Sequence, residues 1–442
     1  MDLNQLKMSK KLKIVNIVPG FGGTFYCGNC LRDSGHTKSL IKLGHDAMML
    51  PIYLPLTLEH GVEKNTTPIF YGAVNIFIKQ KFKFLRRMPQ WLENFFNSSS
   101  ILRYAAKKAG STRTEGLEEM TISMLKGKDG YQNQELQELI DFLKDHEQPD
   151  VVHLSNALLM GLAKQIKQQL KIPVVCSLQD EDQWVDVMND YYRPKVWDLM
   201  AERAEDVDAF ISVSSYYADA MKQKMRIPDE KMYIVPIGID PGLYKPTKPS
   251  LSPRVIGYIS RMYEEHGFGL LIDAFIKLKN TNGYEDVLLK LSGGFTADDK
   301  KYVNKQIKKL KKAGLYNDVE FIDEYQPEKR FGFYQKLTFL TVPVLKGEAF
   351  GVYQLESMAC GIPLVQPDLG AFPEVINNTG GGVTFSPNTV EAMTKKWMEV
   401  FENPELISKM SESGHKNTLE KYNIDNVSEM VLDIYKNVTN DS

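Results

Sequence analysis

The chain has 442 residues, of which 43% are hydrophobic and 25% are charged. These values are ordinary for a globular protein, and the length predicts two or three domains that each bury a core. The formal net charge of −2 argues against a nucleic-acid partner held by bulk electrostatics. Four cysteines in so long a chain do not form a disulfide framework and indicate a reducing compartment.

No stretch of the sequence is typical of a secretory signal or a membrane span. Residues 1–13 are polar, and the apolar run Ile14–Val18 is too short for either role. No later stretch approaches the roughly 18 uninterrupted apolar residues that a span needs. We therefore expect a cytoplasmic protein.

A βαβ unit is predicted at the N-terminus. Lys13–Val18 is typical of a buried parallel strand, Asn29–Leu43 of a helix, and Asp46–Tyr53 of a second strand. The glycine-rich loop with Gly22 and Gly23 follows the first strand, at the end of the sheet where open α/β folds bind ligands. It lacks the full dinucleotide fingerprint, so both a ligand loop and a simple tight turn remain open.

Two cysteines follow this loop in a CxxC pattern, at Cys27 and Cys30. Such a pair can be a redox couple or half of a metal site. No second CxxC or histidine pair accompanies it, and the other thiols, Cys176 and Cys360, lie in apolar runs. Packing at the start of the helix is the alternative, and no metal site is predicted.

Cations and aromatic residues alternate in the segment from about residue 76 to 110, for example in KQKFKFLRR. A basic amphipathic segment of this kind can rest on the anionic inner face of a membrane or steer an anionic substrate. A partly buried helix pair whose lysines extend into solvent gives the same pattern. Peripheral membrane contact through residues 76–110 is therefore an open possibility.

Further strands are predicted at residues 149–154, 172–178 and 209–214. The second of these ends at Gln179-Asp180-Glu181-Asp182, and acids in that place either bind a hydroxyl-rich acceptor or solvate a loop. The proline-rich segment 241–253 then separates a first domain, residues 1–240, from the rest of the chain.

The α/β alternation restarts after this linker. Strands are predicted at residues 254–259, 287–291, 319–322 and 340–343, with 370–376 and 380–383 completing the sheet. A basic helix is expected to end at about Lys312. Two α/β domains joined by a short linker imply a ligand cleft between them.

One stretch of the second half combines two acids with a helix start. Glu348 lies in a predicted loop, and Glu356 lies in a short helix from about Gly351 to Ala359 that Gly361 and Pro363 stop. The N-terminus of a helix exposes N–H groups that suit an anion or a sugar hydroxyl. Glu348 would face the same crevice, and Glu356 could accept hydrogen bonds from a diol.

With this stretch, the chain resembles the family 4 glycosyltransferases, which are retaining, nucleotide-sugar-dependent enzymes. The spacing Glu348-x7-Glu356 with Gly351 matches the paired-glutamate motif of that family, and the sequences ACGIP at 359–363 and IGID at 237–240 match its other conserved stretches. The resemblance covers residues 13 to about 435. It implies an α/β architecture of the GT-B type, in which two Rossmann-like domains face each other across a deep cleft.

The resemblance also implies roles for individual residues. Arg261 and Glu348 would be catalytic, with Arg261 on the donor diphosphate and Glu348 against the transferred sugar, while Glu356 would hold the ribose hydroxyls. His266 stands where the family has a phosphate-binding lysine, which puts the second phosphate cation in doubt. The rest of the donor site would be Ala349, Phe350, Gly351 and Val352.

On the first domain, the resemblance implies a cleft wall of Gly22, Gly23, His153 and Asp180. The chain has Ser155 and Gln179 where many relatives have histidines, so acceptor contacts cannot be carried across. His153 itself is interpreted as structural rather than catalytic. Residues 254–415 would bind the donor, residues 416–442 would pack back on the first domain, and no metal or cofactor is expected.

Two other functions stay open at this point. One is a sugar-nucleotide epimerase or a phosphorylase on the same fold, although nothing marks the pyridoxal-binding lysine of a phosphorylase. The other is a nucleotide- or carbohydrate-binding protein without turnover, motivated by His266, Ser155 and Gln179. A donor-sugar hydrolysis assay separates these alternatives from a transferase.

Overall fold

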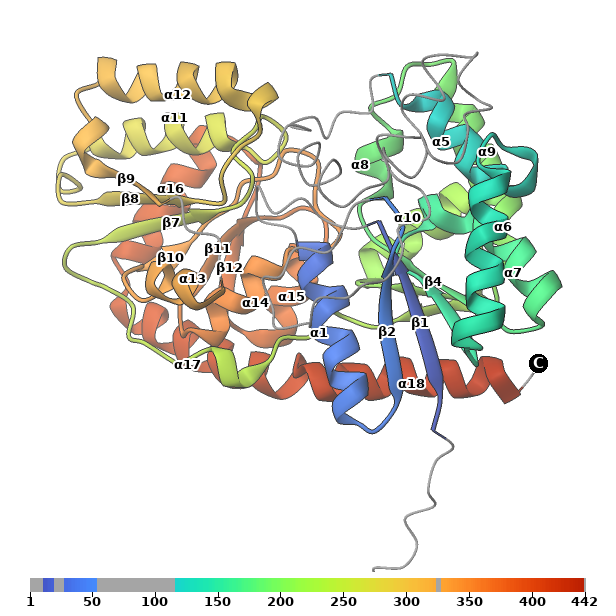
Figure 1. The fold of residues 1–442 in the computed structure, drawn as a ribbon. Helices are drawn as coiled ribbons and strands as arrows, with labels where there is room; N and C mark the ends of the chain where they lie inside the picture. The colour runs from blue at the N-terminus through green and yellow to red at the C-terminus, as the bar shows by residue number, and fades with distance from the viewer. Residues whose placement is uncertain (1–10, 20–27, 54–115, 323–326, 441–442) are drawn as a thin grey trace, which may run out of the picture.

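The structure of the protein, a computed structural model, describes residues 11–19, 28–53, 116–322 and 327–440. Its described residues form two α/β domains, each built on a parallel sheet (Figure 1). The elements of the first domain are β1 (Lys13–Val18), α1 (Gly28–Lys42), β2 (Asp46–Pro51), α5 (Glu118–Leu125), α6 (Asn133–Phe142), β3 (Val151–Leu154), η4 (Ala157–Leu162), α7 (Ala163–Leu170), β4 (Val174–Leu178), α8 (Glu181–Val185), α9 (Tyr192–Ala204), β5 (Ala209–Ser212), α10 (Ser215–Met225) and β6 (Met232–Ile234).

The sheet of the first domain has the order β2-β1-β3-β4-β5-β6, and every pair in it is parallel. Its central strands β3, β4 and β5 are buried along their whole length. Continuous burial is expected for strands with helices on both faces, and it explains why their sequences, such as VVCSL in β4, do not alternate. Ladder pairs such as Ile14 with Val151 and Val175 with Ala209 fix the register.

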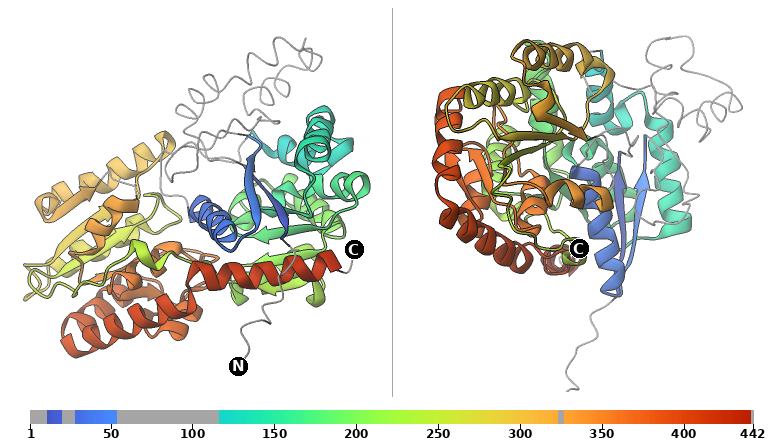
Figure 2. Two further views of the ribbon diagram at one scale, coloured as in Figure 1. Left: turned by 60° about the horizontal axis from the view of Figure 1, so that its bottom comes forward. Right: turned by 90° about the vertical axis from the view of Figure 1, so that its left-hand side faces the viewer.

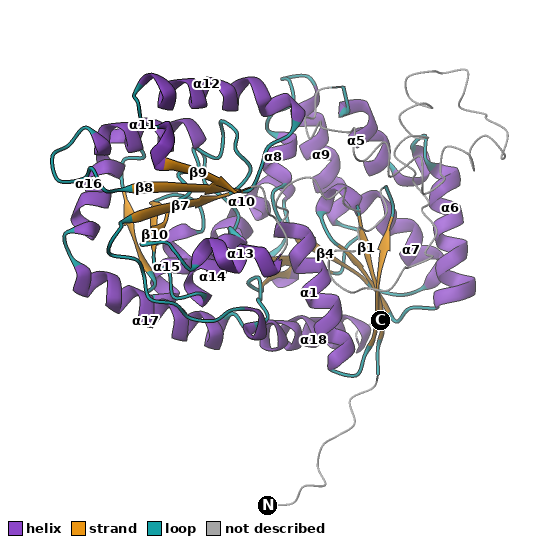
Figure 3. Cartoon of the chain, turned by 60° about the vertical axis from the view of Figure 1, so that its left-hand side comes forward, coloured by secondary structure: helices purple, strands orange, loops and turns teal. Residues whose placement is uncertain are grey.

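The second domain repeats this plan with the sheet order β12-β11-β10-β7-β8-β9. Its elements are β7 (Val255–Ile259), α11 (Phe268–Lys279), β8 (Leu288–Ser292), η7 (Ala297–Asp299), α12 (Lys300–Lys312), β9 (Val319–Ile322), α13 (Pro327–Tyr334), β10 (Phe339–Leu340), α14 (Val352–Ala359), β11 (Leu364–Pro367), α15 (Phe372–Thr379), β12 (Gly382–Phe385), α16 (Val390–Phe401), α17 (Pro404–Lys421) and α18 (Ile424–Asn440). Strands β7, β8 and β9 point toward the first domain (Figure 3).

Two predicted strands of the second domain are wrong in part. Residues 370–376 do not complete the sheet, because Phe372–Thr379 form helix α15. Its first turn contains Pro373, its buried residues recur at helical spacing, and Gly380 ends it in the left-handed conformation at φ 65°. The strand predicted at 340–343 is shorter and lies at Phe339–Leu340.

The last helix, α18, leaves the second domain and lies along the sheet of the first (Figure 2). Its side chains Val427, Val431 and Tyr435 share one buried cluster with Ile14 and Val175 of the first sheet. Helix α17 continues to Lys421, so the boundary drawn from the sequence between residues 415 and 416 falls inside a helix.

Candidate functional site

A cleft of about 750 Å³ lies between the two domains. In both domains the carboxyl ends of parallel strands supply its walls, which is where open α/β sheets bind ligands. The first domain contributes Gly28, Asn29, Gln179, Asp180, Asp182, Gln183, Trp184, Asp186, Val187, Val213 and Ile237. The second domain contributes Ser260, Arg261, Tyr263, Glu264, Glu265, His266, Asp298, Asp299, Tyr302, Lys346, Gly347, Glu348, Ala349, Phe350, Gly351, Val352 and Tyr353.

Arg261 follows β7 and presents a fixed guanidinium to this cleft. Its Nε donates to Asp299 Oδ2 at 2.8 Å, and its Nη2 donates to Asp299 Oδ1 at 3.1 Å and to Thr296 Oγ1 at 3.2 Å. The guanidinium carbon lies 4.6 Å from the ring centroid of Tyr263. These contacts hold a planar cation of the shape that phosphate oxygens bind well.

His266 lies beside Arg261 but does not add a second charge. Its Nδ1 shares a hydrogen bond of 2.6 Å with Ser260 Oγ, and its ring packs 4.4 Å from that of Tyr263. Burial, together with the positive charge of Arg261, lowers the pKa of His266 to about 3. The imidazole is therefore neutral at pH 7 and offers a hydrogen bond at the position where the resemblance implies a lysine.

The loop with Glu348 is shaped by two glycines in the left-handed region, Gly347 at φ 89° and Gly351 at φ 83°. A Cβ on Gly347 would lie 3.0 Å from the backbone of Gly370, and one on Gly351 would lie 3.0 Å from the ring of Tyr353. Both the conformation and the space therefore require glycine. The Glu348 carbonyl also accepts a hydrogen bond of 3.0 Å from Ala371 N, which fixes the loop.

The Glu348 carboxylate is half-buried at the start of α14 and accepts a hydrogen bond from the hydroxyl of Tyr353. Burial outweighs that hydrogen bond and raises the pKa of Glu348 to about 7. Asp180 lies on the opposite wall, and burial and the charge of Glu348 raise its pKa well above the usual value. Two carboxyl groups therefore face the same space, and the second to ionise does so against the charge of the first.

Glu356 is not among the residues that line the cleft. It is a buried residue of α14 and is 1% exposed. Its Oε1 accepts hydrogen bonds from Tyr244 at 3.0 Å and Arg330 at 2.9 Å, and its Oε2 accepts one from Tyr334 at 2.9 Å. The carboxylate thus joins the linker, α13 and α14, and its predicted ribose contact stays a prediction.

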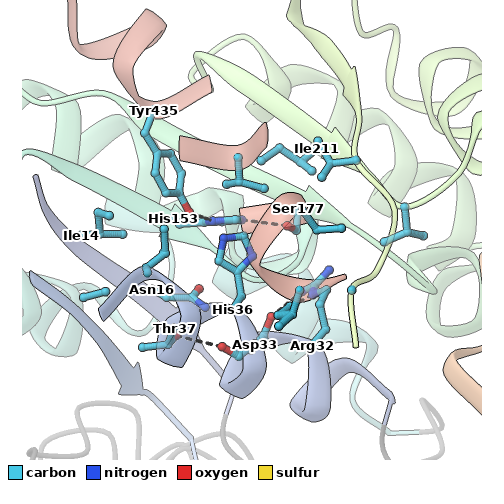
Figure 4. Close-up of a pocket in the computed structure, with 18 of the residues that line it drawn as sticks. Ile14, Asn16, Arg32, Asp33, His36, Thr37, His153, Ser177, Ile211 and Tyr435 are labelled. Atoms are coloured by element: carbon cyan, nitrogen blue, oxygen red, sulfur yellow. Dashed lines mark hydrogen bonds and ion pairs between the residues drawn. The ribbon is translucent and has the colours of Figure 1, made fainter. Parts of the chain in front are cut away.

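His153 is also not among the residues that line the cleft, and its predicted place in the first-domain wall stays a prediction. It is buried on β3 and shares hydrogen bonds with Tyr435 of α18 and, at 2.8 Å, with Ser177 Oγ (Figure 4). The cavity beside it measures only about 30 Å³, enough for water. Burial lowers the pKa of His153 well below its usual value, so the ring is a neutral link between the first sheet and α18.

The two walls of the cleft meet at the loop that contains Glu348. Ser214 Oγ, which also caps α10, donates to the carbonyl of Ala349 at 2.7 Å. Glu374 of α15 accepts hydrogen bonds from Ser215 N at 3.0 Å and from Tyr216 N at 3.4 Å. A carboxylate of the second domain therefore caps a helix of the first.

Several of these groups are missing from the residues singled out in the sequence. Asp299 fixes Arg261 from 38 positions away, and Tyr353 hydrogen-bonds Glu348 from the first turn of α14. A tyrosine five residues after the motif acid was the one local signal. Nothing near Arg261 in the sequence indicates Asp299.

Some predictions concern residues that the structure does not describe. Gly22, Gly23, Cys27 and the segment 76–110 lie outside the described residues. Over the described ranges, no cluster of three or more His, Cys, Asp or Glu side chains could hold a metal ion. In the same ranges, no helix combines the length and apolar character that crossing a bilayer requires.

Both domains of the chain match known protein families. Residues 121–243 match the family described as Glycosyltransferase Family 4, and residues 245–417 match Glycosyl transferases group 1. A curated relative, the MMP alpha-(1->4)-mannosyltransferase of Mycolicibacterium hassiacum, is 22% identical over 65% of this chain and 70% of its own.

Solved structures share the fold at low identity. Sucrose-phosphate synthase from Thermosynechococcus elongatus superimposes with a TM-score of 0.69 at 15% identity, over 98% of this chain and 100% of its own. HepE of Anabaena in complex with UDP-glucose superimposes with a TM-score of 0.65 at 14% identity, over 96% and 100%. These neighbours confirm the predicted GT-B architecture. The chain belongs to the family 4 glycosyltransferases.

Proposed function

We propose that this glycosyltransferase moves a sugar from a nucleoside-diphosphate sugar to a hydroxyl acceptor, with retention of anomeric configuration. The observation that carries the proposal is the meeting of Arg261 and Glu348 at one cleft between two Rossmann-like domains. A nucleotide-sugar donor is further supported by the HepE structure, which holds UDP-glucose on the same fold.

In the proposed reaction, the bond between the anomeric carbon and the diphosphate oxygen breaks, and its electron pair leaves with the diphosphate. The acceptor oxygen forms the new bond to the same carbon from the same face. Its proton passes to the departing diphosphate, which leaves as the nucleoside diphosphate. Charge therefore develops on the leaving group while the sugar passes through an oxocarbenium-like state.

Side chains on the second-domain wall would stabilise both the negative charge on the leaving diphosphate and the positive charge on the sugar. Arg261 is the fixed cation that would stabilise the leaving diphosphate, and the largest catalytic contribution would come from this preorganised charge. Glu348, when ionised, would lie beside the electron-poor sugar. The neutral ring of His266 would donate a hydrogen bond to a phosphate oxygen, and Glu356 would hold the α14 start in place through its three partners.

The test is a donor screen with the purified full chain. UDP-, GDP- and ADP-sugars are each incubated with a mixture of hydroxyl acceptors, and release of the nucleoside diphosphate is measured with and without acceptor. We expect acceptor-dependent release from one donor class, and NMR of the product should show the donor's anomeric configuration.

Two results would contradict the proposal in different ways. Tight binding of a nucleotide sugar without any release, across all donors and acceptors, would indicate a binding protein without turnover. An inverted product would leave transfer in place but remove retention. Conversion of the donor sugar to its epimer without nucleotide release would indicate an epimerase.

A further inference from the structure

Gln179 is a buried amide at the cleft that no group of the described residues satisfies. It follows β4, is 4% exposed and lines the cleft. In the part of the chain that the structure describes, neither its Oε1 nor its Nε2 has a hydrogen-bond partner. Buried side-chain amides in native proteins are nearly always paired, so an unpaired one needs an explanation. At a cleft wall, the hydroxyl of a bound ligand, which both donates and accepts, could pair with either end of this amide.

The wall around Gln179 is acidic. Asp180, Asp182 and Asp186 line the cleft beside it. Asp182 accepts a hydrogen bond of 3.0 Å from Tyr217, and Asp186 is paired with Lys224, whose Nζ lies 2.7 Å from Oδ2. Burial and neighbouring carboxylates raise the pKa of Asp180 and of Asp182, although the hydrogen bond from Tyr217 lowers the pKa of Asp182. A further negative charge on this wall is therefore unfavourable.

The described cations of the cleft lie on the other wall. They are Arg261, which the donor diphosphate would engage, and Lys346, whose side chain is exposed. Glu264, Glu265 and Asp298 also face the cleft on that side. A cleft with one dominant sign of charge concentrates ligands of the opposite sign and repels those of its own.

Resting on the proposed function, we infer that the acceptor binds between Gln179 and Asp182 and that it carries no phosphate or carboxylate. It is a sugar or similar polyol that is uncharged or bears an ammonium group. Its hydroxyls donate to the aspartate oxygens and pair with both ends of the Gln179 amide, while the exposed part of Trp184 offers an apolar face. Repulsion from the same carboxylates disfavours an anionic acceptor.

The experiment uses four acceptors on one ring: a methyl glucoside, a methyl glucosaminide, a glucose phosphate and a methyl glucuronide. With the donor found in the screen, kcat/KM is measured for each. We expect turnover of the neutral and amine forms and at least a tenfold lower kcat/KM for the two anions. Equal or better use of either anion would overturn the inference.

Variants test which residues of the first-domain wall cause the preference for an uncharged acceptor. Asp182→Asn should reduce the difference in kcat/KM between the phosphate acceptor and the neutral acceptor severalfold. The reason is that it removes one repelling charge without changing the shape of the side chain. Gln179→Leu should lower kcat/KM for the neutral acceptor tenfold or more, while hydrolysis of the donor by water continues. The control is Asp190→Asn, which removes an exposed acid outside the cleft and should leave the acceptor ranking unchanged. An unchanged ranking in Asp182→Asn would count against the inference.

A binding measurement keeps the inference testable if no donor is turned over. The same four sugars are titrated calorimetrically into the protein saturated with a nucleoside diphosphate. Binding of the neutral or amine sugar, lost in Gln179→Leu, would support the acceptor site although the proposed function had failed. Preferred binding of the phosphate would overturn the inference whatever the donor screen gave.

Discussion

The two walls of the cleft differ in how their polar groups are satisfied. On the second domain, Arg261 is held by Asp299, Glu348 by Tyr353, and the nearby Glu356 by three donors. On the first domain, Gln179 has no partner among the described residues, and Asp180 is half-buried and faces the like charge of Glu348. The wall proposed to bind the donor is thus preorganised before a ligand arrives, whereas the wall proposed to bind the acceptor contains an amide that a ligand would satisfy.

The largest expected effect comes from removing the buried carboxylate of Glu356, which pairs with Arg330 in the second domain. Glu356→Ala removes the carboxylate that Arg330 faces in the interior, and we expect it to lower the free energy of unfolding by about 3–5 kcal/mol. Urea unfolding of the two proteins measures this. If Glu356 also binds ribose, Glu356→Gln should weaken nucleoside-diphosphate binding, and unchanged affinity by calorimetry would contradict that role.

Glu402→Ala is the matched control for this change. Glu402 also accepts a tyrosine hydrogen bond, from Tyr284 at 2.7 Å, but its side chain is exposed. Its removal should have a much smaller effect, because water replaces the lost contact. Equal destabilisation by both changes would show that burial of Glu356 is not what matters.

The second effect removes the fixed cation. Arg261→Met should lower kcat by about 10²–10³-fold, or about 2.7–4 kcal/mol, as for loss of one preorganised charge-stabilising donor. Steady-state kinetics with the identified donor measure it. Arg254→Met is the control, because Arg254 forms a comparable pair with Asp286 away from the cleft. A similar loss in both variants would indicate a folding defect rather than catalysis.

The third effect concerns pH and the pair of carboxyls that face each other. Because the pKa of Glu348 is raised from 4.5 to about 7, the folded state keeps a proton that the unfolded state loses in between. This group's contribution to stability is therefore highest below pH 4.5 and falls as the pH rises to about 7. Glu348→Gln removes that fall.

The measurement is the urea midpoint of both proteins at steps between pH 4.5 and 8. The stability of Glu348→Gln relative to the natural protein should rise through this window and level off above pH 7. Glu391→Gln is the control, since Lys277 holds the pKa of Glu391 below its usual value and keeps it ionised throughout. A constant difference for Glu348→Gln would refute the raised pKa.

The smallest expected effect concerns the contact between the two domains at Glu374. Glu374→Ala removes the cap that the second domain places on α10, and we expect a cost of about 1 kcal/mol, or about a fivefold higher donor KM. Glu405→Ala, an acid in the first turn of α17 in the same domain, is the control and should leave KM unchanged. No change in KM for Glu374→Ala would mean that this contact does not couple to donor binding.

Much of the fold could be predicted from local pattern. The buried runs of the strands, the proline-rich linker and the glycines around Glu348 are all properties of short stretches. Val375 and Ile376 favour a strand at 370–376, which is wrong, whereas Pro373 indicates the start of the helix that the structure forms at 372–379. Burial of one face of this helix outweighs the strand propensity of these two residues.

The partners of the site residues could not be predicted in this way. Glu356 meets Tyr244 from 112 positions away, and His153 meets Tyr435 from 282 positions away. Only the packing of distant elements brings such pairs together, and no spacing rule in one sequence encodes them. The motif therefore located Glu356 but did not show that protein donors already occupy its oxygens.

The shared cluster of α18 and the first sheet has a consequence for synthesis. A ribosome makes the chain from the N-terminus, so β1 and β3 leave it long before Val427, Val431 and Tyr435 exist. Until those residues emerge, the apolar face of the first sheet that packs against α18 stays without this helix. The first domain is begun first and completed last, and a chain halted before α18 would expose that surface to aggregation or to a chaperone.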